Sequence, residues 1–153
     1  MRAIRAEFVI LAASVFALGF ALTSQYGFGF HPCELCIWQR WAYGAVILFA
    51  AVSFRFKLAF KFMILALASL TVLATYHFGI EQKWWEGFQT CTSSFTANSI
   101  EELKAQIMGA PVVRCDEAIW FFLKLSMAGW NVLYSAFLTA YAIKSLFSRR
   151  RTG

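Results

Sequence analysis

The sequence predicts an all-α integral membrane fold, a four-helix bundle with a long loop outside the membrane, on three observations. First, 60% of the residues are hydrophobic and only 14% are charged, whereas soluble domains have about 25% charged residues. Second, the apolar residues gather in four long runs, and a spanning helix needs roughly 20 such residues. Third, most positive charges gather on one side of the bundle that these runs imply.

The four runs predict spans at about 6–24, 37–55, 59–79 and 127–147. Each run is expected to be a helix, because the bilayer core offers the backbone no other hydrogen-bonding partners. The first run also has the positive start of a signal peptide. However, no A-x-A cleavage site follows it, and the run continues to spanning length. We therefore expect one membrane domain over residues 1–153.

Charge distribution predicts the topology. Lys and Arg mark the cytoplasmic side of a membrane protein. Nine of them lie before the first run, near the junction of the second and third runs, or at the end of the fourth run and after it. Glu7 is the only acidic residue on that side of the predicted bundle. Both termini are thus expected in the cytoplasm, and the loops at about 25–36 and 80–126 outside it. This distribution explains the net charge of +6 without nucleic acid as a partner. The nine residues are Arg2, Arg5, Arg55, Lys57, Lys61, Lys144, Arg149, Arg150 and Arg151.

All four cysteines fall in the two outer loops. Cys33 and Cys36 form a C-x-x-C pair in the first loop, and Cys91 and Cys115 lie in the second. The outer compartment of a bacterium is the periplasm, which is kept oxidising. Two pairs on one face favour a relay in which a thiolate attacks a neighbouring disulfide, although the second pair also suits a static disulfide that stabilises its loop. A metal site is disfavoured, because the spacing lacks the second close pair of a zinc site.

Three side chains near the C-x-x-C pair are candidates for its chemistry. Cys36 is expected to begin the second helix, where the partial positive charge of a helix N-terminus lowers a thiol's pKa. Arg40 follows one turn later. It is expected to stabilise an anion, since a charge in a span is costly and usually functional, although it could also extend its head group to the interface. His77, near the outer end of the third span, suits either proton transfer or capping of helical carbonyls.

The second outer loop is expected to contain a short helix. Ser99 and Glu102 form a capping box. Apolar residues recur after it with helical spacing, which predicts an amphipathic helix at about 100–108 lying on the membrane surface.

The stretch Pro32–Arg40, Pro-Cys-Glu-Leu-Cys-Ile-Trp-Gln-Arg, resembles the signature of the DsbB family of disulfide bond formation proteins. The resemblance extends along nearly the whole chain and includes the stretches Tyr76–Glu81 and Pro111–Asp116. The order of the cysteine pairs also fits. The related vitamin K epoxide reductase family places its loop pair before its membrane C-x-x-C, whereas here the C-x-x-C comes first.

This resemblance implies an enzyme of the bacterial inner membrane, a quinone-reducing protein-disulfide oxidoreductase. Cys91 would be attacked by a reduced periplasmic DsbA-like protein of the thioredoxin fold, and Cys115 would then pair with Cys33. Cys36 would act on ubiquinone or menaquinone, with Arg40 stabilising the charged complex. The lipid bilayer is the remaining expected partner.

Other interpretations stay open at this point. The resemblance makes His77 a weaker candidate for contact with the quinone. A membrane scaffold or sensor with structural disulfides is an alternative from another class of protein. A third possibility keeps the enzyme but gives it a dedicated thiol protein as partner. The sequence does not distinguish a DsbA-like partner from a dedicated thiol protein. It also does not distinguish ubiquinone from menaquinone.

Overall fold

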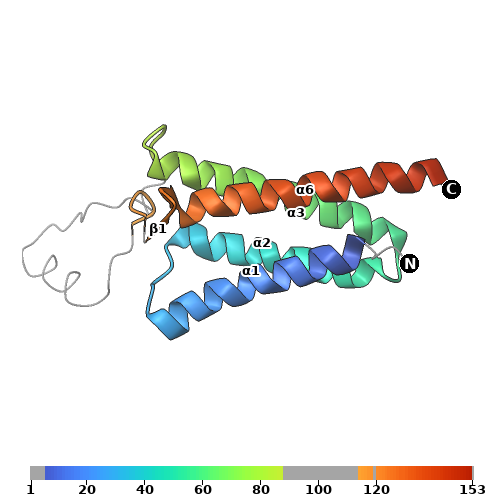
Figure 1. Ribbon diagram of the computed structural model, residues 1–153, viewed down its shortest axis with the longest axis horizontal. Coiled ribbons are helices and arrows are strands. Elements are labelled where there is room, and N and C mark those ends of the chain that lie inside the picture. Colours follow the sequence, from blue (N-terminus) through green and yellow to red (C-terminus); the bar gives the residue numbers. More distant parts are fainter. Residues whose placement is uncertain (1–5, 88–113, 119, 153) are drawn as a thin grey trace, which may run out of the picture.

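The computed structural model of the protein describes residues 6–87, 114–118 and 120–152. Within these ranges four long helices lie side by side along the long axis of the molecule, as Figure 1 shows. The start of α1 and the end of α6 lie at one end of this bundle, and a small hairpin lies at the other. The elements are α1 (Ala6–Phe28), α2 (Glu34–Ser53), α3 (Lys57–Glu81), β1 (Phe121–Phe122), β2 (Leu125–Ser126) and α6 (Met127–Thr152).

Each of the four predicted spans forms a helix, but the helices are longer than the apolar runs at several ends. The prediction that Cys36 begins α2 was wrong, because the helix starts at Glu34 and Cys33 is its N-cap. The Cys33 sulfur accepts a hydrogen bond from the backbone N–H of Cys36 at 3.3 Å, which satisfies one of the free N–H groups of the first turn. Cys36 therefore lies inside the first turn of α2.

Three of the described helices, α1, α2 and α3, are long and apolar enough to cross a membrane. The fourth predicted span, α6, is not among them, because polar side chains lower its hydropathy. Several of these face the bundle: Asn131 donates to Gln39 of α2 at 2.7 Å, and Thr139 lies 3.1 Å from Thr71 of α3. Polar groups that pair inside a bundle are compatible with a spanning helix. The fourth span stays a prediction.

At the end of the bundle where α1 starts and α6 ends, an apolar core lies beside an ion pair between Glu7 and Arg149. Glu7 of α1 is 4% exposed, and it accepts two hydrogen bonds from the Arg149 guanidinium at 2.7 and 2.6 Å. The guanidinium also lies over the ring of Phe60, 4.4 Å from its centroid. A buried carboxylate needs such a partner, so this pair joins α1 to α6. The core residues here are Ala6, Ile10, Val46, Ala50, Phe60, Met63, Leu67, Leu138 and Ala142.

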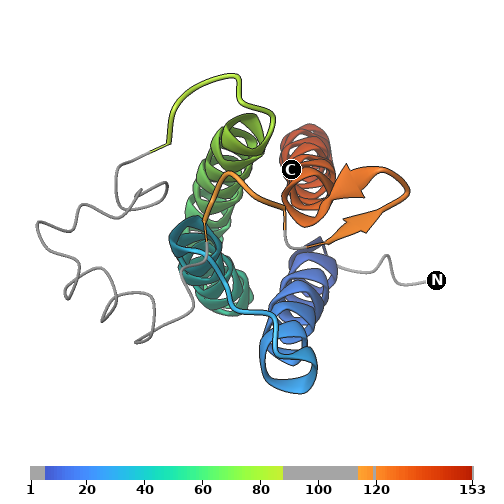
Figure 2. The same ribbon diagram turned by 90° about the vertical axis from the view of Figure 1, so that its left-hand side faces the viewer.

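The hairpin β1–β2 corrects the expectation of a purely α-helical chain. Its two strands pair antiparallel, and Figure 2 shows it next to the start of α6. The two turn residues, Leu123 and Lys124, have φ values of 52° and 64°. Tight hairpins of this kind normally use Asn-Gly or Asp-Gly, so the sequence pattern did not indicate one. The Trp130 indole N–H donates to the carbonyl of Phe122 at 3.0 Å and ties the hairpin to α6.

Candidate active site

The link between α1 and α2 delivers the cysteine pair to the end of the bundle opposite the termini. An αL cap ends α1: Gly29 donates to the Gln25 carbonyl at 3.0 Å, and Phe30 donates to the Ser24 carbonyl at 3.1 Å. Gly29 has a φ of 72°, which is the left-handed conformation that such a cap requires and that glycine adopts without strain. The chain then turns back, and α2 begins directly after Cys33.

Cys33 and Cys36 are both free thiols, with their sulfurs 2.9 Å apart. Cys33 is 3% exposed, and its sulfur also lies 3.5 Å from Nε2 of His77. The hydrogen bond from the Cys36 thiol lowers the pKa of Cys33 to about 5; burial opposes this change, and His77 and the backbone N–H of Cys36 add to it. The sequence pattern pointed to Cys36 as the thiolate. The structure instead directs the donors of the helix N-terminus at Cys33, because Cys33 is the capping residue.

His77 connects the cysteine pair to the interior of the bundle. It lies on α3, is 3% exposed, and uses both ring nitrogens: Nε2 faces Cys33 and Nδ1 lies 3.0 Å from the amide nitrogen of Gln39. A Glu81 carboxylate oxygen is 4.0 Å from Nε2, and the hydroxyl of Ser126 donates to the other oxygen of that carboxylate. Of the two roles expected from the sequence, this geometry suits proton transfer next to a thiol.

Arg40 lies on α2 but is held by α1. Its guanidinium donates to the side-chain oxygen of Gln25 and, at 3.1 Å, to the carbonyl of Ala21. It is half-buried, so its charge stays near the cysteine pair and does not simply extend into solvent. A guanidinium has more donors than these two contacts use, which leaves Arg40 able to bind a further oxygen.

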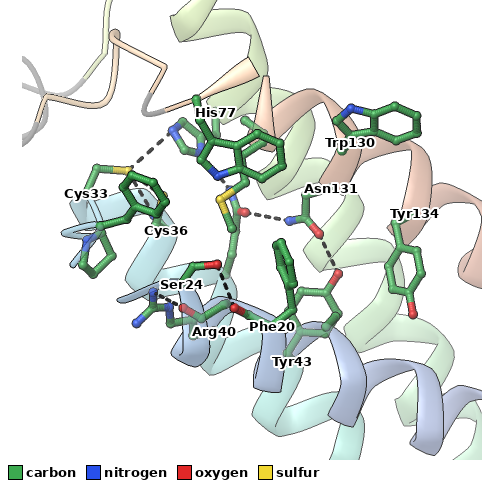
Figure 3. A pocket seen from close by; sticks show the side chains of 18 of the residues that line it. Phe20, Ser24, Cys33, Cys36, Arg40, Tyr43, His77, Trp130, Asn131 and Tyr134 are labelled. Carbon is green, nitrogen blue, oxygen red and sulfur yellow. Dashed lines mark hydrogen bonds between the residues drawn. The ribbon is translucent and has the colours of Figure 1, made fainter. Parts of the chain in front are cut away.

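A cavity of about 580 Å³ opens beside these groups. Figure 3 shows Cys36, His77 and Arg40 around its polar part and aromatic side chains around the rest. Apolar walls with a few convergent polar groups are the usual make-up of a small-molecule site. The apolar lining includes Phe16, Ala17, Phe20, Ala21, Trp120, Phe122, Met127, Ala128, Trp130, Leu133 and Phe137.

Cys115 reaches the same end of the bundle from the second loop. It is fully buried and disulfide-bonded, and it belongs to one buried cluster with Cys33. The next residue, Asp116, is fastened by two cations: hydrogen bonds from Arg114 and Lys83 hold the pKa of its carboxyl well below the usual range. These contacts keep the Cys115 segment against the end of α3. Cys91 and the predicted helix at about 100–108 lie outside the described residues.

The donor atoms of Cys33, Cys36 and His77 lie within 4.8 Å of one another. A thiol pair with a neighbouring histidine needs the same proximity to exchange protons and disulfides. We assign no metal to this group.

Fold and site together define a class: a helical membrane protein with a reactive thiol pair at the edge of an apolar cavity and a disulfide-bonded cysteine packed nearby. The family model described as "Disulfide bond formation protein DsbB" matches residues 4–144. The chain therefore belongs to the DsbB family, as its C-x-x-C stretch predicted. Membership makes it a disulfide oxidoreductase of a family of inner-membrane proteins that form disulfide bonds.

Curated relatives agree with this assignment. A disulfide bond formation protein B from Aromatoleum aromaticum is 31% identical over 151 residues, covering 89% of this chain and 87% of that protein. Proteins of the same name from an Azoarcus species and from Acinetobacter baylyi are 29% and 25% identical, and cover 87% and 92% of this chain and 86% and 89% of their own lengths. No solved structure matches the chain.

Several residues of the site had no predicted role. Gln39, Tyr43 and Asn131 form a hydrogen-bonded chain that ends at His77. One feature of the sequence could have indicated two of them, because polar residues inside apolar runs are usually functional or paired, and Gln39 and Asn131 both interrupt such runs.

Proposed function

We propose that this protein is an inner-membrane thiol oxidase that reoxidises a periplasmic DsbA-like dithiol protein and passes the electrons to a membrane quinone. One observation carries the proposal. The Cys33–Cys36 pair borders an apolar cavity on one side, and Cys33 shares a buried cluster with the disulfide-bonded Cys115 on the other. Such a pair can exchange disulfides with the loop and electrons with a molecule dissolved in the bilayer.

The exchange proceeds in balanced steps. A thiolate of the reduced partner attacks Cys91, forms a mixed disulfide with it and releases Cys115 as a thiolate. Cys115 then attacks Cys33 of the oxidised C-x-x-C pair, so that a Cys115–Cys33 bond forms, the Cys33–Cys36 bond breaks and Cys36 leaves as a thiolate. The second thiol of the partner attacks the mixed disulfide, so that the oxidised partner leaves and Cys91 is released as a thiolate. Cys91 then attacks Cys115, which re-forms the Cys91–Cys115 bond and releases Cys33 as a thiol. The Cys33–Cys36 dithiol would re-form its own disulfide by giving two electrons and two protons to the quinone, so the net reaction oxidises the partner's dithiol and restores both disulfides.

The cavity suits a ubiquinone or menaquinone as the final acceptor. Its largely apolar lining fits a ring with a hydrocarbon tail, and Arg40 is the residue that would hold a ring oxygen. When bound, the quinone supplies the acceptor for two electrons and two protons. Both cysteines of the pair line the cavity, and Cys36 is the more exposed of the two. Contact between His77 and the quinone stays a prediction, since His77 lines the cavity but faces Cys33.

The proposed topology has both termini in the cytoplasm and the cysteines in the periplasm. The shape of the bundle supports this, because the start of α1, the end of α6 and the short α2–α3 link lie at one end and the cysteine pair at the other (Figure 1). Arg55 lies in that link and Lys57 is the first residue of α3, as expected for a cytoplasmic connection.

The test is quinone reduction by the purified chain in lipid nanodiscs, supplied with a reduced DsbA-like protein and, in separate reactions, a short-tailed ubiquinone or menaquinone. We expect reduction with wild type, none with Cys36→Ser, and wild-type rates with Ser53→Ala. Ser53 is a matched control because it is buried at the other end of α2 and its hydroxyl donates to the Ala50 carbonyl of the same helix. Absence of cysteine-dependent reduction with either quinone would refute the proposal.

The scaffold or sensor hypothesis makes the opposite prediction in cells. It expects Cys36→Ser to leave disulfide formation in periplasmic proteins unchanged. A mixed disulfide trapped with Cys115→Ser would identify the partner, and thereby distinguish a general oxidase from a dedicated thiol protein.

A further inference from the structure

A chain of hydrogen bonds runs from the middle of the bundle to His77. The Tyr43 hydroxyl donates to Oδ1 of Asn131 at 2.6 Å, and Nδ2 of Asn131 donates to Oε1 of Gln39 at 2.7 Å. Nε2 of Gln39 then lies 3.0 Å from Nδ1 of His77. The chain links α2, α6 and α3, and Figure 3 shows Asn131 between Tyr43 and the histidine end of the chain. Gln39 and His77 are 7% and 3% exposed, so water does not readily replace these partners.

The direction of each bond follows from the chemistry of the side chains. An amide nitrogen only donates and an amide oxygen only accepts. Because Tyr43 donates to the Asn131 oxygen, the Asn131 nitrogen is left to donate to Gln39. Gln39 therefore presents its nitrogen to His77, and Nδ1 of His77 must accept. A neutral imidazole has one protonated nitrogen, so the proton is on Nε2, which faces the Cys33 sulfur at 3.5 Å.

We propose that Gln39, oriented by Asn131 and Tyr43, is a positioning residue that holds neutral His77 in its Nε2–H form, so that His77 donates to the sulfur of Cys33. The inference adds to the proposed function, because it gives a reason for Cys33 to be the stabilised thiolate of the pair. Gln39 does this without a hydrogen bond to either sulfur, since the hydrogen bonds of its side chain go to His77 and Asn131.

The hydrogen bonds of His77 agree with an unprotonated Nδ1. A second proton would occupy Nδ1, and the Gln39, Asn131 and Tyr43 side chains would all have to turn to accept it. The charged groups near the ring are Glu81, 4.0 Å from Nε2 on the same helix, and Arg40, which lines the same cavity from α2. Arg114 and Glu117 line that cavity from the loop side, and the described parts of α1 and α6 add no charged side chain to it.

The first test is a nitrogen-15 NMR spectrum of the full chain in lipid nanodiscs, grown with ring-labelled histidine. The chain has only two histidines, so His31→Asn assigns the signals of His77. Protonated and bare ring nitrogens differ strongly in chemical shift. We expect a bare Nδ1 and a protonated Nε2 in wild type. A protonated Nδ1 with a bare Nε2 would overturn the proposal, and this spectrum needs no substitution in the hydrogen-bonded chain.

The second test compares variants by the reactivity of Cys33. In reduced protein, iodoacetamide alkylation of the Cys33 peptide is followed by mass spectrometry across pH. We expect Gln39→Leu to raise the midpoint by about one pKa unit, which means about tenfold less thiolate below the midpoint, and Tyr43→Phe to raise it by less. Ser24→Ala should leave it unchanged, because Ser24 lines the same cavity but bonds to the Phe20 carbonyl.

The outcomes separate this inference from the proposed function. An unchanged or lowered midpoint in Gln39→Leu would contradict the positioning role of Gln39. Neither test uses a quinone or a partner protein. A failure of quinone reduction would therefore refute the proposed function and leave these two results to decide the role of Gln39 on their own.

Discussion

Removing the Cys36 thiol should make Cys33 a weaker acid. The pKa of Cys33 falls from the ordinary thiol value of 9.0 to about 5, and the hydrogen bond from the Cys36 side chain is the largest cause. Cys36→Ala abolishes this donor but keeps the backbone N–H that also contacts the Cys33 sulfur at 3.3 Å. The pH at which Cys33 loses its thiolate should therefore rise, while the remaining contacts keep it below the ordinary value.

The size of the change can be bounded from the structure. The fall from 9.0 to about 5 has four lowering causes, two from Cys36 and two from His77, and burial opposes them. A hydrogen bond to a charged group contributes about 1.5–3 kcal/mol. We therefore expect a rise of about one to two pKa units in Cys36→Ala.

The assay is the pH profile of Cys33 alkylation in reduced protein, resolved by peptide. In wild type the reactivity should be constant above neutral pH and be lost as the pH falls through about 5. Cys36→Ala should lose it at a higher pH. Cys36→Ser, which keeps a hydroxyl donor, should fall between the two. A midpoint that is the same in all three proteins would show that the Cys36 side chain does not stabilise the Cys33 thiolate.

Three further predictions concern other contacts. Arg40→Met should raise the KM for quinone about tenfold or more, because a charged donor is lost; an unchanged KM in steady-state reduction would contradict its proposed role. Arg149→Met should lower stability by about 1–3 kcal/mol, since it removes two hydrogen bonds from the buried Glu7 carboxylate; thermal unfolding in detergent measures this, and replacing that carboxylate as well should recover part of the loss. Gly79→Ala should cost about 1–3 kcal/mol, because a Cβ there would lie 2.0 Å from the ring of Trp85. The same assay with Gly44→Ala, where a Cβ meets nothing within 4 Å, should show no loss.

The helices were predictable, but their ends depended on local hydrogen bonds. The apolar runs located α1, α2 and α3, because a spanning helix needs about 20 mostly apolar residues and a run of that length is visible in the sequence. The extension of α1 to Phe28 and the start of α2 at Glu34 depend on the cap at Gly29 and on the capping sulfur of Cys33. Cysteine is not among the usual N-cap residues, so the pattern placed the start of α2 too late.

The hairpin and α6 departed from the sequence pattern for different reasons. The hairpin turn uses Leu123 and Lys124 in the left-handed conformation, although residues with side chains seldom adopt it. The hydrogen bond from the Trp130 indole of α6 to the Phe122 carbonyl joins the hairpin next to this strained turn to the helix. The low hydropathy of α6 reflects polar residues such as Asn131, whose partner Gln39 is far away in the chain.

The sequence by itself determined the membrane class, the expected sidedness, the four cysteines and the family, because composition, charge and short motifs act locally or sum along the chain. It also identified His77 and Arg40 as candidates. Only the tertiary structure decided which sulfur receives the donors, which atom of His77 faces it, and that Arg40 is held by α1. A hydrogen bond forms only when donor and acceptor approach to about 3 Å. For Gln39 and Asn131, 92 positions apart, the packing of helices achieves that approach, and no pattern along the chain encodes it.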